Sequence, residues 1–188
     1  WKPLPPGFVN VPFNDINAIK EATTEDTCAV MLEPVQGEAG VIIPSSTYLQ
    51  EVRKWCTQQS MLLIVDEVQT GLGRLGTLWG YEKFDIEPDV MTLAKALGNG
   101  VPIGAFLARN EVAVLEPGDH GSTFGGNALT CAAAFASTSY IIDKRISAQA
   151  ETMGQYLQKE LKALDPDGLV IEEIRGMGLL VGVVFKNE

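Results

Sequence analysis

The sequence has 188 residues, which fits one domain or one domain with part of a second. It carries 24 acidic and 14 basic residues, a formal net charge of −10, and no basic stripe, which argues against nucleic acid as a partner. No apolar run approaches the roughly 20 residues that span a bilayer, and the opening lacks the pattern of a signal peptide. We therefore expect no membrane partner either.

The first half of the chain alternates apolar strands with helical segments. After a proline-rich opening, the first periodic segment lies at 15–22, and a helix is predicted at 47–59. Strands are predicted over four apolar segments, residues 28–35, 61–68, 90–94 and 103–108. The run at 61–68 is almost continuously apolar, which is typical of strands covered on both faces. Apolar strands joined by helix-length connections predict an α/β fold with a mostly parallel sheet.

The second half of the chain has a different pattern. Residues 128–142 are Ala-rich and helical, and residues 147–164 place apolar side chains at helical spacing. Residues 170–185 have a strand-like pattern broken by glycines. We therefore expect residues 1–140 to form a portion of a large domain. Residues 141–188 should begin a smaller α+β C-terminal domain that is incomplete in this chain.

The cysteine and histidine content limits the possible chemistry. Cys28, Cys56 and Cys131 are odd in number and far apart in the sequence. This pattern indicates reduced thiols in the core of a cytoplasmic protein rather than a disulfide framework. His120 is the single histidine, and the sequence has no Cys-x-x-Cys pair, so we expect no metal site.

Two carboxylates end the apolar strand at 61–68. Asp66 and Glu67 therefore lie at the carboxyl edge of the sheet, where ligands bind in open α/β folds. One interpretation is the magnesium-binding strand of a P-loop nucleotidase, but the sequence lacks the G-x-x-x-x-G-K-[ST] loop. A second is dinucleotide binding, because GLGRLG at 71–76 matches G-x-G-x-x-G. The upstream carboxylates and an interrupted following helix oppose it, so we interpret 71–76 as a glycine-rich surface turn.

A third interpretation joins Asp66 to Lys95. Pyridoxal phosphate chemistry needs a lysine that holds the cofactor aldehyde as an imine and a carboxylate that keeps the pyridine nitrogen protonated. Two adjacent parallel strands that end in these residues would place them on opposite sides of one ring, and their 29-residue spacing fits one crossover connection. Gln69 would then donate to the phenolic oxygen of the ring, and Val68 would pack on the ring face.

Each member of this pair also has a plainer interpretation. Apolar residues precede Lys95 and glycines follow it, so we expect a buried lysine, whose pKa burial would lower. Lysines at strand ends nevertheless commonly extend their amine to solvent. Asp66 alone would be a strand-end carboxylate that caps a loop. The combination of the two residues favours the cofactor interpretation, because an activated lysine is the nucleophile of Schiff-base chemistry.

Four motifs follow one another along the chain. They are EPVQGEAGV at 33–41, LLIVDEVQTGLGRLG at 62–76, TLAKALGNGVPIGA at 92–105 and GSTFGGNAL at 121–129. Together they resemble class III aminotransferases, which are fold-type I pyridoxal-phosphate enzymes, and most of all the acetylornithine-type members. The resemblance covers essentially the whole chain. It implies transamination of N-acetylornithine with 2-oxoglutarate by a cytoplasmic homodimer with shared active sites.

Two alternatives remain beside that function. The first is a sister ω-aminotransferase that acts on ornithine, 4-aminobutyrate or an acylated lysine. The second is an inactive subunit or fragment that only supports dimerisation.

The resemblance also implies roles for individual residues. Lys95 would bind pyridoxal 5'-phosphate and move a proton between substrate and cofactor, Asp66 would pair with the pyridinium nitrogen, and Gln69 would meet the phenolic oxygen. Thr123 matches a residue that reaches the cofactor phosphate of the neighbouring subunit, although a glycine-rich loop before a helix is the plainer interpretation. Glu38 matches a substrate-binding glutamate that pairs with an arginine and helps switch between two substrates. Its plainer interpretation is a solvated loop acid.

Three groups of the family have no counterpart in this sequence. They are the upstream glycine-rich segment that cups the cofactor phosphate, the aromatic residue that stacks on the ring, and the late arginine that binds the substrate carboxylate. We therefore expect a partial chain, which carries the lysine and pyridine side of the site and lacks much of the phosphate and substrate side.

Overall fold

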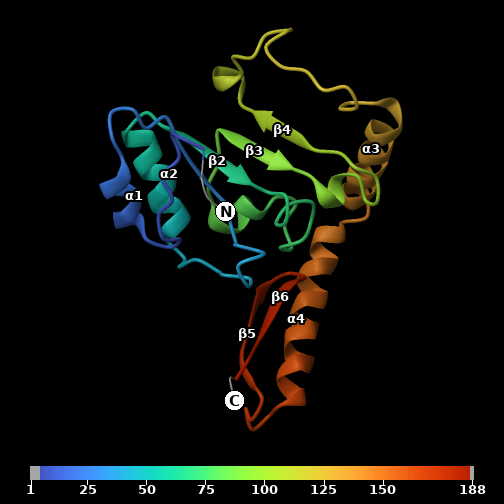
Figure 1. The fold of residues 1–188 in the computed structure, drawn as a ribbon. Helices are drawn as coiled ribbons and strands as arrows, with labels where there is room; N and C mark the ends of the chain where they lie inside the picture. The colour runs from blue at the N-terminus through green and yellow to red at the C-terminus, as the bar shows by residue number, and fades with distance from the viewer. Residues whose placement is uncertain (1–4, 187–188) are drawn as a thin grey trace.

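The computed structural model describes residues 5–186, which form an α/β fold (Figure 1). Within these residues the main sheet has four strands in the order β1-β2-β3-β4. The strands are β1 (Ala29–Leu32), β2 (Leu62–Asp66), β3 (Val90–Leu93) and β4 (Ala105–Ala108). Strands β1, β2 and β3 run parallel, whereas β4 runs antiparallel to β3. The predicted fold class and the mostly parallel sheet are confirmed.

The main core lies between the first two helices and the sheet. Helix α2 (Tyr48–Gln58) packs on β2, and α1 (Ile16–Ala22) packs on α2. Val52 from α2 and Leu63 and Val65 from β2 are completely buried in this core. Full burial of an aliphatic side chain contributes about 1.5–3 kcal/mol, so this layer fixes the position of β2 within the fold.

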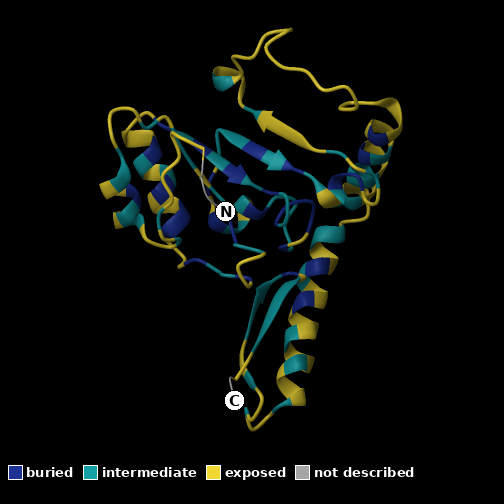
Figure 2. Cartoon of the chain, viewed as in Figure 1, coloured by how far each residue is buried: buried dark blue, intermediate teal, exposed yellow. Residues whose placement is uncertain are grey.

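The two faces of the sheet are not equally covered. Successive side chains of a strand point to opposite faces, so Leu63 and Val65 share one face while Leu62 and Ile64 lie on the other, where they are only half-buried. Figure 2 shows that β4 is largely exposed, and Phe106 in this strand is 52% accessible to solvent. The prediction that strands are covered on both faces is therefore only partly correct for the described residues.

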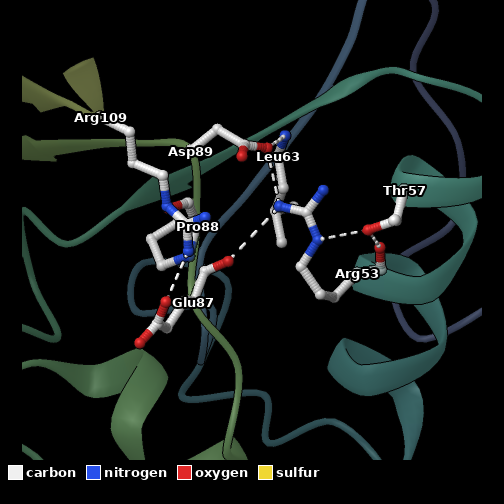
Figure 3. Close-up of polar contacts among 7 residues, drawn as sticks. All are labelled: Arg53, Thr57, Leu63, Glu87, Pro88, Asp89 and Arg109. Carbon is white, nitrogen blue, oxygen red and sulfur yellow. Dashed lines mark hydrogen bonds and ion pairs between the residues drawn. The ribbon is translucent and has the colours of Figure 1, made fainter. Parts of the chain in front are cut away.

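A polar network fixes the amino end of β3 (Figure 3). Oδ2 of Asp89 accepts hydrogen bonds from the Leu63 amide and from Arg53 Nη1, both at 2.7 Å. Because Arg53 belongs to α2, Asp89 joins that helix to β2 and to the start of β3. Burial alone would raise the pKa of Asp89, but the bonds from Leu63 and Arg53 outweigh burial and lower it. Beside it, Arg109 forms an exposed ion pair with Glu87 at 2.6 Å.

The chain turns sharply between α3 (Ala128–Asp143) and α4 (Ile146–Leu164), where Arg145 has a φ of 50°. Helix α4 is followed by an antiparallel hairpin of β5 (Ile171–Met177) and β6 (Leu180–Phe185). Helix and hairpin lie side by side and extend away from the main sheet (Figure 1). The domain boundary near residue 140 stays a prediction, and the turn between the two helices lies just beyond it.

Residues 146–185, the C-terminal unit, are held together and docked by close contacts. Any Cβ at Gly154 of α4 would collide with the carbonyl of Gly178 in the hairpin turn, so the two elements meet backbone to backbone. Lys83, in the short helix η1 (Gly80–Phe84), forms an ion pair with Glu151 of α4 at 2.6 Å. Contacts therefore hold α4 against the hairpin within the C-terminal unit and join the unit to η1.

The glycine-rich turn at 71–76 is the docking surface of this unit. The Leu179 amide donates a hydrogen bond to the Arg74 carbonyl at 2.9 Å. Leu72 and Leu75 are buried, and only Arg74 of the six residues is exposed. The prediction of a surface turn is therefore wrong, because α4 and the hairpin cover a stretch whose local sequence reads as a loop.

The prediction of three core thiols is also wrong. Cys56 lies in the core, and burial raises its pKa to about 11, whereas Cys28 and Cys131 are exposed free thiols. Across residues 5–186, no helix combines the length and the apolar character that crossing a membrane requires.

Candidate active site

The carboxyl ends of β2 and β3 bring two predicted site residues to one edge of the sheet. Asp66 ends β2, and Lys95 follows the end of β3 after Ala94. The two strands are adjacent and parallel, and Asp66 is in register with Thr92. The prediction that these residues end neighbouring parallel strands is correct for Asp66, whereas Lys95 lies two residues beyond the end of β3. Ligands of open α/β sheets bind at this edge.

The carboxylate of Asp66 is held by one of its two oxygens. Oδ1 accepts hydrogen bonds from the Val68 amide and from Thr92 Oγ1, both at 3.0 Å. No hydrogen bond to Oδ2 comes from residues 5–186. The side chain is thus fixed in orientation and keeps one acceptor oxygen for a ligand.

Lys95 begins the short helix η2 (Lys95–Leu97) in a strained backbone conformation. Its φ of 46° lies in the left-handed region, which non-glycine residues adopt at an energetic cost and which recurs at functional sites. The side chain is exposed, so the prediction of a buried lysine is wrong in the described residues. The sheet has ended at this point, and Leu97 rather than Lys95 turns into the core.

A cavity of about 610 Å³ opens beside Lys95. Val68 and Gln69 line it from the loop after β2, and Lys95 and Asn99 line it from the loop after β3. The glycine-rich turn, the start of α4 and the residues next to the hairpin turn complete the wall. The cavity therefore lies between the carboxyl edge of the main sheet and the C-terminal unit. The structure brings three of the predicted site residues, Lys95, Val68 and Gln69, to it.

The other predicted site residues lie outside this wall. Asp66 directly precedes three lining residues but is not one of them. Glu38 is exposed in the loop at 37–41. Thr123 is exposed in the long loop at 113–127, which leads from the far end of β4 to α3 (Figure 1). Neither Glu38 nor Thr123 reaches the cavity next to Lys95.

Sequence reasoning gave no role to Glu67, which the structure shows to be a buried anchor. Its side chain is 2% exposed and accepts hydrogen bonds from Thr70 Oγ1 at 2.6 Å and from the Gly80 and Tyr81 amides at 2.9 and 2.8 Å. Burial raises its pKa, and these three bonds oppose that shift. Strand alternation could have indicated the buried position of Glu67, because neighbouring side chains such as Asp66 and Glu67 point to opposite faces of a sheet.

Gln69 packs against the loop that carries Glu38. A Cβ at Gly37 would lie 2.6 Å from Oε1 of Gln69, so only glycine allows the amide to sit there. The Gly37 amide in turn donates a hydrogen bond to Oε2 of Glu33 at 3.0 Å. The loop at 37–41 therefore supports one wall residue of the cavity from behind.

Comparison with known proteins agrees with this geometry. Residues 2–188 match the model of the family described as Aminotransferase class-III. The acetylornithine aminotransferase of Methanopyrus kandleri is 50% identical over 189 residues, which cover 100% of this chain and 48% of that protein. The acetylornithine aminotransferase of Gloeobacter violaceus is 48% identical over 188 residues, which cover 100% of this chain and 47% of that protein.

Solved structures give the same result. An acetylornithine aminotransferase from Elizabethkingia anophelis superimposes with a TM-score of 0.92 at 40% identity, covering 97% of this chain and 47% of that one. The ornithine aminotransferase from Toxoplasma gondii, which has partial occupancy of PLP at its active site, superimposes with a TM-score of 0.93 at 40% identity. The match covers 98% of this chain and 44% of that one. The chain spans about half the length of these relatives. Since the family model matches nearly every residue, the chain belongs to the class III aminotransferase family.

Proposed function

We propose that the complete protein is a pyridoxal-phosphate-dependent aminotransferase. It transfers the terminal amino group of N-acetylornithine to 2-oxoglutarate and yields N-acetylglutamate semialdehyde and glutamate. The observation that carries the proposal is the placement of Asp66 and Lys95 at the carboxyl ends of adjacent parallel strands, beside a cavity. Identities near 50% to acetylornithine aminotransferases support the choice of substrate.

The groups at this edge of the sheet fit the cofactor. Lys95 offers an exposed amine, Gln69 an amide donor and Val68 an apolar surface, all in one cavity wall. Asp66 offers an oriented carboxylate with one acceptor oxygen left over. An amine, a carboxylate and an amide donor are the groups that an aldehyde, a pyridinium nitrogen and a phenolic oxygen require.

Each residue then has a defined task. When bound, pyridoxal phosphate supplies an electron sink for the carbon that bears the amino group. Lys95 holds the cofactor covalently and, as a free amine, takes and returns the proton at that carbon. Asp66 keeps a proton on the ring nitrogen, Gln69 donates to the phenolic oxygen, and Val68 fixes the plane of the ring.

The proposal extends to assembly and location. We propose a homodimer in the cytoplasm, in which Thr123 contacts the cofactor phosphate of the neighbouring subunit and Glu38 contributes to substrate choice. The exposure of Thr123 supports the dimer, because a group on an exposed loop is accessible to a second subunit. Three thiols without a disulfide among them agree with a reducing compartment.

The test is a comparison of amino donors with the complete protein. Purified protein should absorb visible light, lose that absorbance with borohydride, and transaminate N-acetylornithine faster than ornithine, 4-aminobutyrate or an acylated lysine. Ornithine is the second candidate, because the neighbours include an ornithine aminotransferase at 43% identity. Faster turnover of ornithine would replace the proposed substrate. The absence of any cofactor absorbance would reject the enzymatic function.

A further inference from the structure

Residues 68–79, the wall segment, connect Glu67 to η1 without a helix or strand of their own. Within this segment, Val68, Gln69 and residues 71–74 line the cavity beside Lys95. The Arg74 carbonyl accepts the amide of Leu179, so the same segment also carries the docked C-terminal unit. Because no hydrogen-bond ladder orders the wall segment, its shape depends on contacts made by the residues around it.

The side chain of Glu67 holds the two ends of the wall segment together. Its Oε2 accepts hydrogen bonds from Thr70 Oγ1 at 2.6 Å and from the Gly80 amide at 2.9 Å, and its Oε1 accepts the Tyr81 amide at 2.8 Å. Thr70 lies near the start of the segment, whereas Gly80 and Tyr81 directly follow its end. One carboxylate therefore closes the segment into a loop.

The main chain of Glu67 fixes this closure to the sheet. Its amide donates to the carbonyl of Thr92 at 3.0 Å, in the strand that leads to Lys95, and its carbonyl accepts the Gly71 amide at 2.9 Å. Packing around the carboxylate is tight, because a Cβ at Gly80 would lie 2.9 Å from Oε2. The wall segment is thus closed at a point whose position β3 defines.

Only an acceptor suits the position of the Glu67 side chain. All three of its partners donate hydrogen bonds, and no ion pair to Glu67 comes from residues 5–186. An ionised carboxylate accepts at both oxygens, whereas an amide side chain would turn an NH₂ group toward at least one of these donors. Hydrogen bonds to a charged acceptor are also stronger than those between neutral groups.

We propose that Glu67 is a positioning residue of the cavity, which keeps Val68 and Gln69 in place for a bound cofactor ring by closing the wall segment. The inference deepens the proposed function and rests on it, because these two residues meet a ring only if the cofactor binds beside Lys95. A wall that is already ordered spares the ligand the cost of ordering it. Glu67 acts through the wall segment, since its own side chain is buried and engaged by three donors.

The first experiment measures cofactor affinity in the complete protein. Glu67→Gln keeps the size of the side chain and should raise the apparent Kd for pyridoxal 5'-phosphate at least about tenfold, the scale of a lost hydrogen bond to a charged group. At saturating cofactor, borohydride should still trap the adduct on Lys95. Glu82→Gln is the matched control, because Glu82 is exposed and accepts the Trp79 amide at 3.0 Å, a bond that the oxygen of glutamine can keep. It should keep the wild-type Kd.

Hydrogen exchange without cofactor gives a readout that does not depend on activity. The Gly73 amide donates to the Leu78 carbonyl within the wall segment, and the Leu179 amide reports on the docked unit. Both should exchange at least about tenfold faster in Glu67→Gln, because the segment opens more often. The Leu63 amide of β2, bonded to Asp89, should exchange as in the wild type. Equally faster exchange at Leu63 would mean that the substitution loosens the whole fold, and the inference would fail.

A second pair of variants keeps the test decisive if Glu67→Gln does not fold. Thr70→Val removes one donor to the carboxylate, whereas Thr70→Ser keeps the hydroxyl, so only the valine variant should bind the cofactor several-fold more weakly. Equal Kd values for these two variants would overturn the inference. So would unchanged exchange at Gly73 in a folded Glu67→Gln protein, or faster exchange there with a wild-type Kd. If the wild type binds no cofactor, the proposed function fails, while exchange at Gly73 and Leu179 still decides whether Glu67 holds the wall segment.

Discussion

Asp66 Oδ1 and Thr92 Oγ1 lie 3.0 Å apart across β2 and β3. Thr92 belongs to the strand that leads directly to Lys95, so the bond that orients the carboxylate also ties it to the strand of the lysine. Regular sheet geometry thereby fixes the carboxylate of Asp66 relative to β3, and Lys95 follows that strand after Ala94, in η2. Sites built on strands hold their groups more precisely than sites built on loops.

Lys95→Ala should abolish the cofactor adduct. Without the amine, borohydride should trap no cofactor on the protein, and turnover of the complete enzyme should fall by at least about a thousandfold. Mass spectrometry after borohydride treatment measures the adduct, and circular dichroism checks that the fold is retained. An adduct that persists on another lysine, such as Lys54 or Lys83, would show that the assignment is wrong.

Asp66→Asn should separate cofactor binding from catalysis. The amide can keep the bonds to Val68 and Thr92, but it cannot hold a proton on the ring nitrogen, so the electron sink is lost. We expect the complete enzyme to bind cofactor and to lose turnover by about two to four powers of ten. Stopped-flow absorbance of the half-reaction gives the rate. Turnover near that of the wild type would make Asp66 a structural strand-end residue.

A hybrid dimer tests the role of Thr123. If this residue serves the partner's site, mixing Lys95→Ala subunits with Thr123→Val subunits places both lesions in one site and leaves the other intact. Activity should then return in part, toward about half per hybrid dimer by simple counting of sites. Native mass spectrometry confirms that subunits have exchanged. Exchange without recovered activity would mean that Thr123 acts within its own chain.

Asp89 should contribute to stability in a way that depends on pH. Its folded-state pKa lies below the ordinary value of 3.8, so its contribution is present above that value and is lost as pH falls through the lower folded pKa. Asp89→Asn should therefore cost about 2 kcal/mol in the free energy of unfolding at neutral pH and flatten the loss of stability in acid. Urea titrations between pH 2 and pH 7 measure both effects.

Glu87→Gln is the control for this measurement. Glu87 is 79% exposed, and its ion pair with Arg109 faces solvent, so its removal should change stability little. If both substitutions lowered the free energy of unfolding equally, the Asp89 network would stabilise the fold no more than an exposed ion pair does.

The three thiols should differ in reactivity. In the native 188-residue chain, Cys28 and Cys131 should react readily with a thiol reagent, whereas Cys56 should react only after unfolding, because it is buried and its pKa is about 11. Titration of the thiols with this reagent, with and without denaturant, gives the number of exposed and of buried cysteines. Rapid modification of Cys56 in the native chain would mean that the core around α2 opens easily.

Local patterns predicted much of the fold and part of the site. The apolar runs located β1 to β4, and the strand-end positions of Asp66 and Lys95 predicted their common edge, because parallel neighbours end together. The antiparallel direction of β4 relative to β3 could not be predicted in this way, because an apolar run has the same pattern in a parallel and in an antiparallel strand.

The errors concern features that long-range packing decides. The glycine-rich turn reads as a surface loop, yet α4 and a hairpin about a hundred residues later in the chain cover it. Lys95 follows an apolar strand, but the backbone turns at its φ of 46° and leaves the side chain in the cavity. Glu67 finds its partners in Gly80 and Tyr81, which no short-range pattern connects to it.

The contact between Arg74 and the hairpin turn also makes this position a reporter of docking. Arg74 is the exposed residue of the glycine-rich turn, and the peptide bond after it is a site for trypsin. Its carbonyl is engaged by the Leu179 amide, and the backbone of Gly178 lies against it, so a protease cannot draw this peptide into its cleft while the C-terminal unit is docked. The rate of cleavage after Arg74 therefore measures how often the unit lifts from the cavity that it helps to enclose.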